Sequence, residues 1–257
     1  MERLLSDRDL WMLIAAGHLR LRGADLRGAR LERAELSEAL LERAVLKGAH
    51  MAGARLRRAN LAGAELQGAD LKGADLGEAD LTEAFLKGAT LWGVHAENAV
   101  MEWAYAEGVF LEWATLRGAR FTGAFMKGAV LTGADAVGAQ FKGANLTGAY
   151  LHGANLQDAV LEHATLDYAD LSGARLCGAD LRSANLTGSN LAGADLTGAR
   201  LENAILRGAD LTGAVMSDAA LDGAALELAT MDAADPPAAA DGPRPRAGVM
   251  AEMRAPA

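Results

Sequence analysis

Five histidines and one cysteine are the residues of this 257-residue chain best suited to bind a metal ion or to act in catalysis: His18, His50, His95, His152, His163 and Cys177. Two metal ligands on one element need a short spacing such as HxxxH, and no pair of these histidines has it. A lone cysteine forms no intramolecular disulfide, and no histidine accompanies it in the sequence pattern. The many glycines fit turns better than a phosphate-binding loop. We therefore expect no catalytic residue, no metal, no cofactor and no enzymatic activity.

Charge is distributed unevenly along the chain. The net charge is −9, which argues against direct binding to nucleic acid through its phosphates. Residues 20–58 carry ten Lys and Arg against five acids, whereas residues 59–233 carry ten against 23. Two interpretations remain open. Either the charges only keep the surface solvated while their balance changes along the chain, or they form a graded field that orients the molecule on a charged protein partner.

A five-residue repeat must position these side chains. Starting at Leu21, every fifth residue up to Met231 is a repeat centre, and 33 of the 43 centres are Leu. Ala stands two residues before 39 of 42 centres, the exceptions being Val94, Val109 and Ser189. Gly stands two residues after 26 of the 43 centres. No insertion or deletion interrupts this frame, so the repeat is the architecture.

A period of five fits a short strand followed by a corner. Ala and Leu alternate with outward residues, as in a strand with one buried face. The residue two after each centre, usually Gly, supplies the positive φ of a type II turn, so that the next Ala faces inward again. Each pentapeptide is then one side of a β-solenoid whose coils contact only their neighbours. Phe85, Tyr105 and Phe125 recur every 20 residues and would stack if four pentapeptides closed one coil.

The two ends of the chain depart from the repeat. Residues 6–18 are predicted to form a helix with Ser6 as its N-cap, and we expect residues 1–20 to cap the first coil. The repeat region covers residues 21–233. The Pro- and Ala-rich residues 234–257 are predicted to be a flexible tail.

The last coil is expected to need a cover. Its layer of Leu221, Leu226 and Met231 would be exposed, which invites either the tail or a second copy of the protein, forming a homodimer through the C-terminal coil. The chain shows neither a basic leader with a signal-peptide core nor about 20 consecutive apolar residues. We therefore expect a cytoplasmic protein without membrane contact.

The repeat resembles a known family. The stretch ANLTGAYLHGANL, residues 144–156, is similar to the A(D/N)LXX motif of the pentapeptide repeat proteins, and the resemblance covers residues 21–231. It implies an all-β fold, a right-handed quadrilateral β-helix with four pentapeptides per coil. Among its members, the quinolone- and albicidin-resistance proteins interact with DNA gyrase. The dimerising C-terminal helix of the quinolone-resistance members has no convincing match here.

Seven aspartates define a candidate acidic interaction surface. They lie from Asp135 onward on the two most acidic sides of such a rod, where Arg175 is the sole cation. At about 4.8 Å per coil they span roughly 23 Å, or about one carboxylate per 3.4 Å, which is close to the phosphate spacing along one strand of B-DNA. The seven are Asp135, Asp158, Asp170, Asp195, Asp210, Asp218 and Asp232.

Between residues 91 and 113, small side chains take some inward positions and large side chains take outward positions, the reverse of the rest of the repeat. Ala96 and Ala106 replace Leu at repeat centres, while five aromatic residues take outward or corner positions: Trp92, Trp103, Tyr105, Phe110 and Trp113. One interpretation is a local bulge whose rings fold over the thinned coil. The other is an exposed aromatic anchor patch, because Trp and Tyr dominate binding hot spots.

These features bear on three possible functions. The favoured one is a DNA-mimicking rod that binds a type II topoisomerase (DNA gyrase or topoisomerase IV) and protects it from inhibitors, as the resemblance implies. The alternative is an interaction rod that modulates another cytoplasmic protein without DNA mimicry. A ligand-handling or catalytic solenoid is the third, and it lacks a site.

Overall fold

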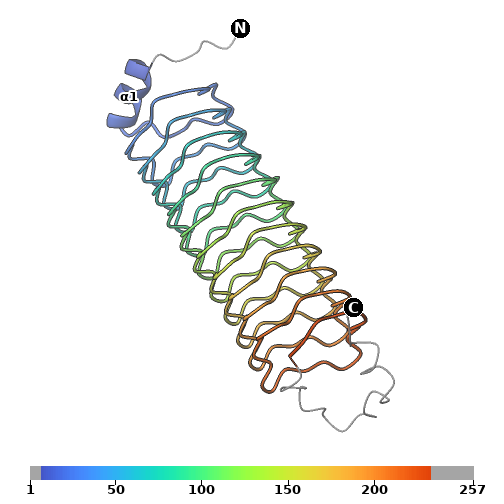
Figure 1. The fold of residues 1–257 in the computed structure, drawn as a ribbon. Helices are drawn as coiled ribbons and strands as arrows, with labels where there is room; N and C mark the ends of the chain where they lie inside the picture. Colours follow the sequence, from blue (N-terminus) through green and yellow to red (C-terminus); the bar gives the residue numbers. More distant parts are fainter. Residues whose placement is uncertain (1–6, 233–257) are drawn as a thin grey trace.

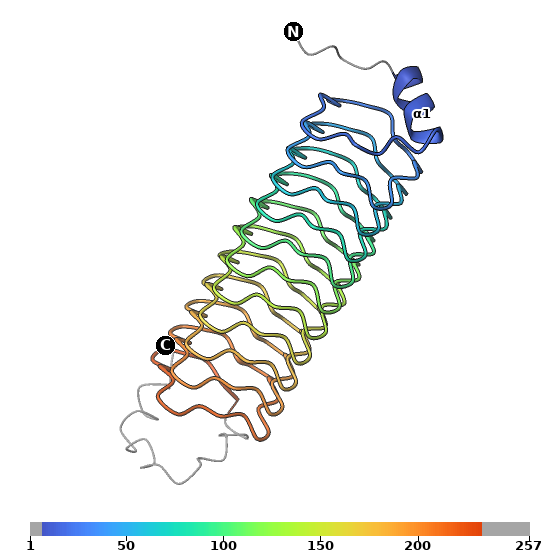
Figure 2. The same ribbon diagram turned by 180° about the vertical axis from the view of Figure 1, so that it is seen from behind.

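The computed structural model describes residues 7–232, which form one short helix and a long stack of four-sided coils (Figure 1). Every β-bridge joins a residue to the residue 20 positions later, in parallel, from Arg20↔Leu40 to Asp210↔Thr230. Four pentapeptides therefore close one coil. The view from behind shows the same regular stack along the whole rod (Figure 2).

The stacking of outward aromatic residues agrees with this register. The rings of Phe85 and Tyr105 lie 4.8 Å apart, those of Tyr105 and Phe125 lie 5.1 Å apart, and both pairs are nearly parallel. The ladder predicted from the 20-residue spacing is thus confirmed.

We number the sides by the bridge residue with which each begins. Side 1 begins at Arg20, side 2 at Asp25, side 3 at Arg30 and side 4 at Glu35, and each side continues in steps of 20 residues. A corner is named by the two sides that it joins. Corner 1–2 thus follows the centre of each pentapeptide on side 1, beginning with Leu21, and the other corners follow in the same way.

The inside of the rod is a single apolar column. Repeat centres and the Ala two residues before them are almost all buried, and they form one cluster from Leu10 to Ala229. Inside it, Phe121 and Phe141 stack with their rings 4.9 Å apart. Each fully buried Leu contributes about 2 kcal/mol. Ser189, at an Ala position, is buried but satisfied by its hydrogen bond to the Leu186 carbonyl, at 2.8 Å.

The corners are uniform whether or not they contain glycine. In each, the N–H of the inward Ala donates to the carbonyl of the preceding centre, as Ala159 does to Leu156 at 3.0 Å. The residue before that Ala has a positive φ, which is +65° at Gly128 and +58° at Trp103. A left-handed conformation costs a non-glycine residue about 1 kcal/mol. The repeat imposes it even on Trp, Tyr and Leu.

The sides are shorter than the strands expected from the sequence. Over residues 7–232 each side contributes isolated bridges and no extended strand. The cause is geometric: only one residue lies between the two inward residues of a pentapeptide, and the corner follows at once. Backbone hydrogen bonds between coils still run along every side.

The predicted N-terminal helix is present as α1, Asp7–Ala15. Gly17, whose φ is +73°, follows the last helical turn and terminates it. The His18 N–H donates to the Leu13 carbonyl, and the Gly17 N–H donates to the Ile14 carbonyl. This is a Schellman motif. Leu10 belongs to the core cluster, and the Trp11 indole donates to the Arg30 carbonyl at 2.9 Å. These contacts favour the expected capping role, which stays a prediction.

At the other end, Leu221, Leu226 and Met231 are only partly buried, unlike the equivalent residues of inner coils. The expected N-cap Ser6 and the expected tail, residues 234–257, lie outside the described residues. The homodimer through this end therefore stays a prediction. Within residues 7–232, no helix has the length and apolar character that crossing a membrane requires.

Candidate protein-binding surface

The histidines and the cysteine lie apart on the outside of the rod. Across the described part of the chain, no group of three His, Cys, Asp or Glu residues could hold a metal ion. Cys177 is half-buried, and its Sγ donates a hydrogen bond to Oδ2 of Asp195 at 3.0 Å. This hydrogen bond, with burial, raises the pKa of the thiol and makes it less reactive.

A groove of about 690 Å³ runs along corner 1–2 of the first coils. Its charged lining residues are Arg22, Glu42, Arg43 and Glu83, and the others are Gly23, Ala62, Gly63 and Thr82. Arg22 and Glu42 form an ion pair at 2.9 Å. The groove thus offers charged side chains but neither a histidine nor a cysteine.

Three of the seven candidate aspartates hold the turns that follow them. Asp170, Asp195 and Asp210 occupy bridge positions, and Oδ1 of each accepts the N–H and the hydroxyl hydrogen of the residue two positions later. Such local side-chain bonds are typical of Asp and Asn. The A(D/N)LXX preference therefore has a structural cause. Asn190, at the same kind of position, bonds to the Ala192 N–H in the same way.

The other four aspartates differ in how they are held. Asp135 pairs with Arg117 at 2.7 Å, and Asp232 accepts the N–H of Gly213 at 2.8 Å. Asp158 and Asp218 lie at corner 4–1 with a positive φ. Apart from Asp135, none of the seven has a cation as a hydrogen-bond or ion-pair partner within residues 7–232. The C-terminal parts of sides 3 and 4 therefore keep most of their negative charge available to a partner.

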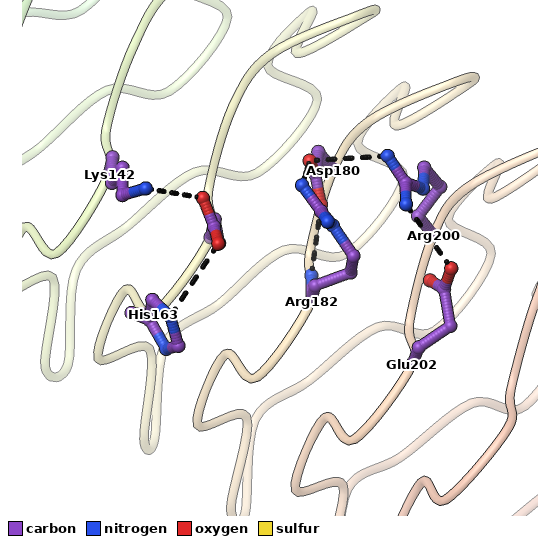
Figure 3. A network of polar contacts seen from close by, with 7 residues as sticks. Lys142, His163, Asp180, Arg182, Arg200 and Glu202 are labelled. Atoms are coloured by element: carbon purple, nitrogen blue, oxygen red, sulfur yellow. Dashed lines mark hydrogen bonds and ion pairs between the residues drawn. The ribbon is translucent and has the colours of Figure 1, made fainter.

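On side 1 and its corner with side 2, several acids are ion-paired with neighbouring cations (Figure 3). Asp180 is paired with Arg182 at 2.5 Å and with Arg200 at 3.7 Å, and Arg200 also reaches Glu202. Lys142 pairs with Glu162 at 2.7 Å, next to His163. The hydrogen bond from Arg182 lowers the pKa of Asp180. These acids are largely neutralised within the rod, which makes them suitable controls for sides 3 and 4.

The basic residues near the front are also paired. Arg55 reaches Glu35 at 3.1 Å, Arg58 reaches Glu78 at 2.8 Å, and Arg57 bonds to the same Glu78. The N-terminal coils therefore present less unpaired positive charge than their sequence indicates.

The five aromatic residues of the candidate anchor patch form two groups. Trp92 and Trp113 lie on corner 3–4, and Phe110 on the adjoining side 3. Trp103 lies on corner 1–2, and Tyr105 on side 2 within the aromatic ladder. The first group thus lies N-terminal to the acidic surface, on the same two sides. The second faces the opposite part of the rod.

Of the two interpretations of this segment, the structure shows no backbone bulge. Bridges continue without a break through Val100↔Arg120 and Tyr105↔Phe125. The rings of Trp103 and Trp113 instead lie over the next coil, where a Cβ added at Gly123 or Gly133 would overlap them. Even so, Trp103 is 53% exposed and Trp113 63% exposed.

Sequence reasoning missed two features of this surface. Glu112, between the two Trp residues of corner 3–4, has a buried Oε2 atom with no hydrogen-bond partner. Tyr150 extends the apolar part of side 3, with 54% of it exposed. Sorting residues in steps of 20 would have placed Glu112 next to Trp92 and Tyr150 in line with Phe110, but it would not have shown the unpartnered oxygen.

Replacing Gly123 by Ala should destabilise the rod more than replacing Gly128. Both glycines have a φ near +65°, so each substitution costs about 1 kcal/mol from the backbone. Only the new Cβ at position 123 meets the Trp103 ring, whereas nothing lies within 4 Å of one at position 128. The Trp103 ring must move aside, and because it is half exposed the overlap should add about 1 kcal/mol, the lower end of the range for overpacked cores. Urea unfolding would measure the difference.

A double variant separates the two causes. Adding Trp103→Ala to Gly123→Ala should recover the overpacking part, as a coupling between the two sites. Equal losses for Gly123→Ala and Gly128→Ala would contradict the observed ring position.

Comparison with known proteins agrees with the repeat and the coil geometry. The model of the pentapeptide repeats matches eight copies, within residues 18–232. The chain belongs to the pentapeptide repeat family. Proteins of this family form right-handed quadrilateral β-helices, and the four-sided coils described above are consistent with that fold. Among curated protein sequences, none matches this pentapeptide repeat protein.

Several solved structures are similar. HetL from Nostoc sp. strain PCC 7120, a pentapeptide repeat protein involved in heterocyst differentiation regulation, is 33% identical over 87% of this chain and 96% of its own, with a TM-score of 0.57. A pentapeptide repeat protein from the thylakoid lumen of Arabidopsis thaliana is 30% identical over 37% of this chain and 67% of its own, with a TM-score of 0.37. QnrB1, a plasmid-mediated fluoroquinolone resistance protein, is 20% identical over 72% of this chain and 92% of its own, with a TM-score of 0.39.

Proposed function

We propose that this pentapeptide repeat protein is a non-enzymatic rod that binds another protein through sides 3 and 4. The observation that carries the proposal is the line of aspartates without an ion-paired or hydrogen-bonded cation along these sides and their corners, from Asp158 to Asp232, with Arg175 beside Asp195 as the one cation on the neighbouring coil. Side 1 and its corner with side 2 offer the contrast, since Glu162, Asp180 and Glu202 there are ion-paired within the rod. A rigid surface of unneutralised charge favours association with a partner of opposite charge.

The finer proposal is that the partner is a protein with a basic DNA-binding surface, and that the rod occupies it as a DNA mimic. The candidates are DNA gyrase and topoisomerase IV, which the rod would protect from inhibitors in the cytoplasm. The carboxylate spacing supports this idea, at about one per 3.4 Å along the rod. The rod itself is not expected to bind DNA.

A second candidate is a rod that modulates another protein without DNA mimicry. It is favoured by the likeness to HetL, which is involved in regulation and matches this chain over most of its length. The exposed rings of Trp103 and Tyr105 would serve such a partner, on a part of the rod away from the acidic surface. The open C-terminal coil would join two copies in either case.

A gyrase supercoiling assay tests the DNA-mimic proposal. Folded protein should change supercoiling and, at lower doses, relieve a gyrase poison. Both effects should weaken as salt rises from about 50 to about 200 mM, because charge dominates the contact. The variant Asp170→Asn/Asp195→Asn/Asp210→Asn should lose most of the effect.

A matched control removes three charges from side 1 and its corner, as Glu162→Gln/Asp180→Asn/Glu202→Gln. It should act like the unaltered protein. Unchanged supercoiling and unrelieved poisoning at a large molar excess of folded rod would exclude the DNA-mimic proposal and leave the second candidate.

A further inference from the structure

Corner 3–4 brings two tryptophans and one carboxylate together. The Gly93 N–H donates to the Glu112 carbonyl at 2.9 Å, so Trp92 and Glu112 occupy matching positions on consecutive coils. Trp113 follows Glu112 directly in the chain. Trp92 is 51% exposed and Trp113 63% exposed, so both rings are accessible at the corner that also carries Glu112.

Glu112 differs from its neighbours on the same coil. Glu102 is held by Arg120, and Glu107 by Lys87 at 3.1 Å. Among the described residues, Glu112 has no partner for a side-chain hydrogen bond or ion pair, and its Oε2 is shielded from solvent without a donor. A shielded acceptor without a donor is unfavourable. Glu112 would therefore give up no protein contact if it turned toward an incoming cation.

The rings supply the second part of a cation site. One face of the Trp113 ring covers the Gly133 turn, which holds the ring in place while leaving the rest exposed. The face of a Trp ring attracts ammonium and guanidinium groups. The site lies on the two sides that carry the aspartates further along the rod, and Lys72 occupies the position matching Trp92 one coil earlier.

We propose that the site formed by Trp92, Glu112 and Trp113 takes a cationic side chain, arginine or lysine, from the bound protein. The inference rests on the proposed function, because it names the group that the partner inserts at the N-terminal end of the acidic surface on sides 3 and 4. The carboxylate pairs with the charge, and the rings pack against the aliphatic stem and the cationic head. The site would set the position of the partner along the rod, which the repetitive aspartates alone do not fix.

Nuclear magnetic resonance of the four Trp indole N–H groups tests the site without the partner. The probe is Nα-acetyl-arginine amide, and its neutral isostere Nα-acetyl-citrulline amide is the control ligand. The arginine probe should shift the Trp92 and Trp113 signals in a saturable way and leave those of Trp11 and Trp103 in place. The citrulline probe should shift none of them.

Two glutamine variants on the same coil complete the test. Glu112→Gln should weaken probe binding about threefold to fivefold, in the range of an exposed ion pair. Glu97→Gln removes the same charge from corner 4–1, where Glu97 has no ion-pair partner within residues 7–232, and should leave the affinity unchanged. Equal effects of the two variants, or equal shifts at Trp103, would overturn the proposal.

The outcome is independent of the proposed function. If gyrase or another partner binds while the probe produces no saturable shift, this site is wrong and the protein-binding rod stands. If the probe binds at Trp92 and Trp113 while the supercoiling assay shows no effect, the DNA-mimic proposal fails and the cation site stands.

Discussion

Replacing Leu156 by Asp is expected to unfold the middle of the rod. Leu156 is fully buried in the core cluster, and its N–H donates to the Arg175 carbonyl of the next coil at 2.7 Å. The buried column around it consists of apolar side chains, which offer no partner to a carboxylate. An uncompensated buried charge costs about 3–5 kcal/mol. Because each coil depends on its neighbours, the loss should spread along the rod.

Circular dichroism during heating and urea unfolding would show this loss. Tyr150→Asp is the matched control, because it places the same charge about one pentapeptide earlier on an outward side chain that is 54% exposed. Its melting temperature should stay close to that of the unaltered protein. Similar melting temperatures for the two variants would contradict the assignment of inward and outward positions.

Removing the turn bonds of Asp170, Asp195 and Asp210 should also have a large effect. Because these residues lie on the outside, the sequence leads one to expect that even reversing their charge leaves the fold intact. The structure shows instead that each accepts hydrogen bonds from the following turn. The triple Ala variant should lose about 1 kcal/mol per site, and the sites are far enough apart to add.

The triple Asn variant separates charge from structure. Asn at equivalent positions already makes the same bond, as Asn185 does to the Thr187 N–H at 3.1 Å. The Asn variant should therefore keep the turn bonds near pH 7 and lose three charges, together with the part of the stability that depends on charge. If the Ala and Asn variants unfold at the same urea concentration, these bonds do not stabilise the turns.

Acid unfolding provides a second measurement on the same residues. Hydrogen bonds lower the pKa of Asp195, mainly through Cys177, and that of Asp210, mainly through Thr212. Since the folded-state pKa lies below the unfolded value of about 3.9, their contribution is present above that pH and is lost as the pH falls through the folded-state pKa. The Asn variant should show a smaller loss of stability below about pH 4.

Much of the fold could be predicted because one short pattern determines it. The five-residue frame separates inward from outward residues, and the spacing of Phe85, Tyr105 and Phe125 indicates four sides. The positive φ at corners also follows from the frequent Gly. What the pattern does not contain is the direction in which a corner side chain points. The Trp103 ring reaches the next coil, so its packing depends on Gly123, 20 residues away.

The candidate surface was predicted less well, because electrostatic pairing depends on neighbours in the coils above and below. Arg57 and Arg58 form a basic cluster in the sequence, but both bind Glu78 in the structure. Glu112 attracted no attention as one acid among many, because the lack of a partner for its buried oxygen, which Gln67 and Glu202 share, is not visible in the sequence. The aromatic segment is continuous in sequence, yet its members turn around the rod and separate onto different sides.

The strict 20-residue register has a consequence for how such a rod changes over time. A pentapeptide lost or gained anywhere in the repeat leaves the hydrogen bonding of every coil possible, because all pentapeptides are equivalent in the backbone. It nevertheless rotates everything after it by a quarter turn relative to everything before it. One such event between Trp113 and Asp135 would move the aspartates of either side 3 or side 4 onto a side that the tryptophans do not share. Only a gain or loss of whole coils of four pentapeptides therefore leaves distant side chains on the same sides. Selection for binding would preserve this relative rotation of distant side chains about the rod axis.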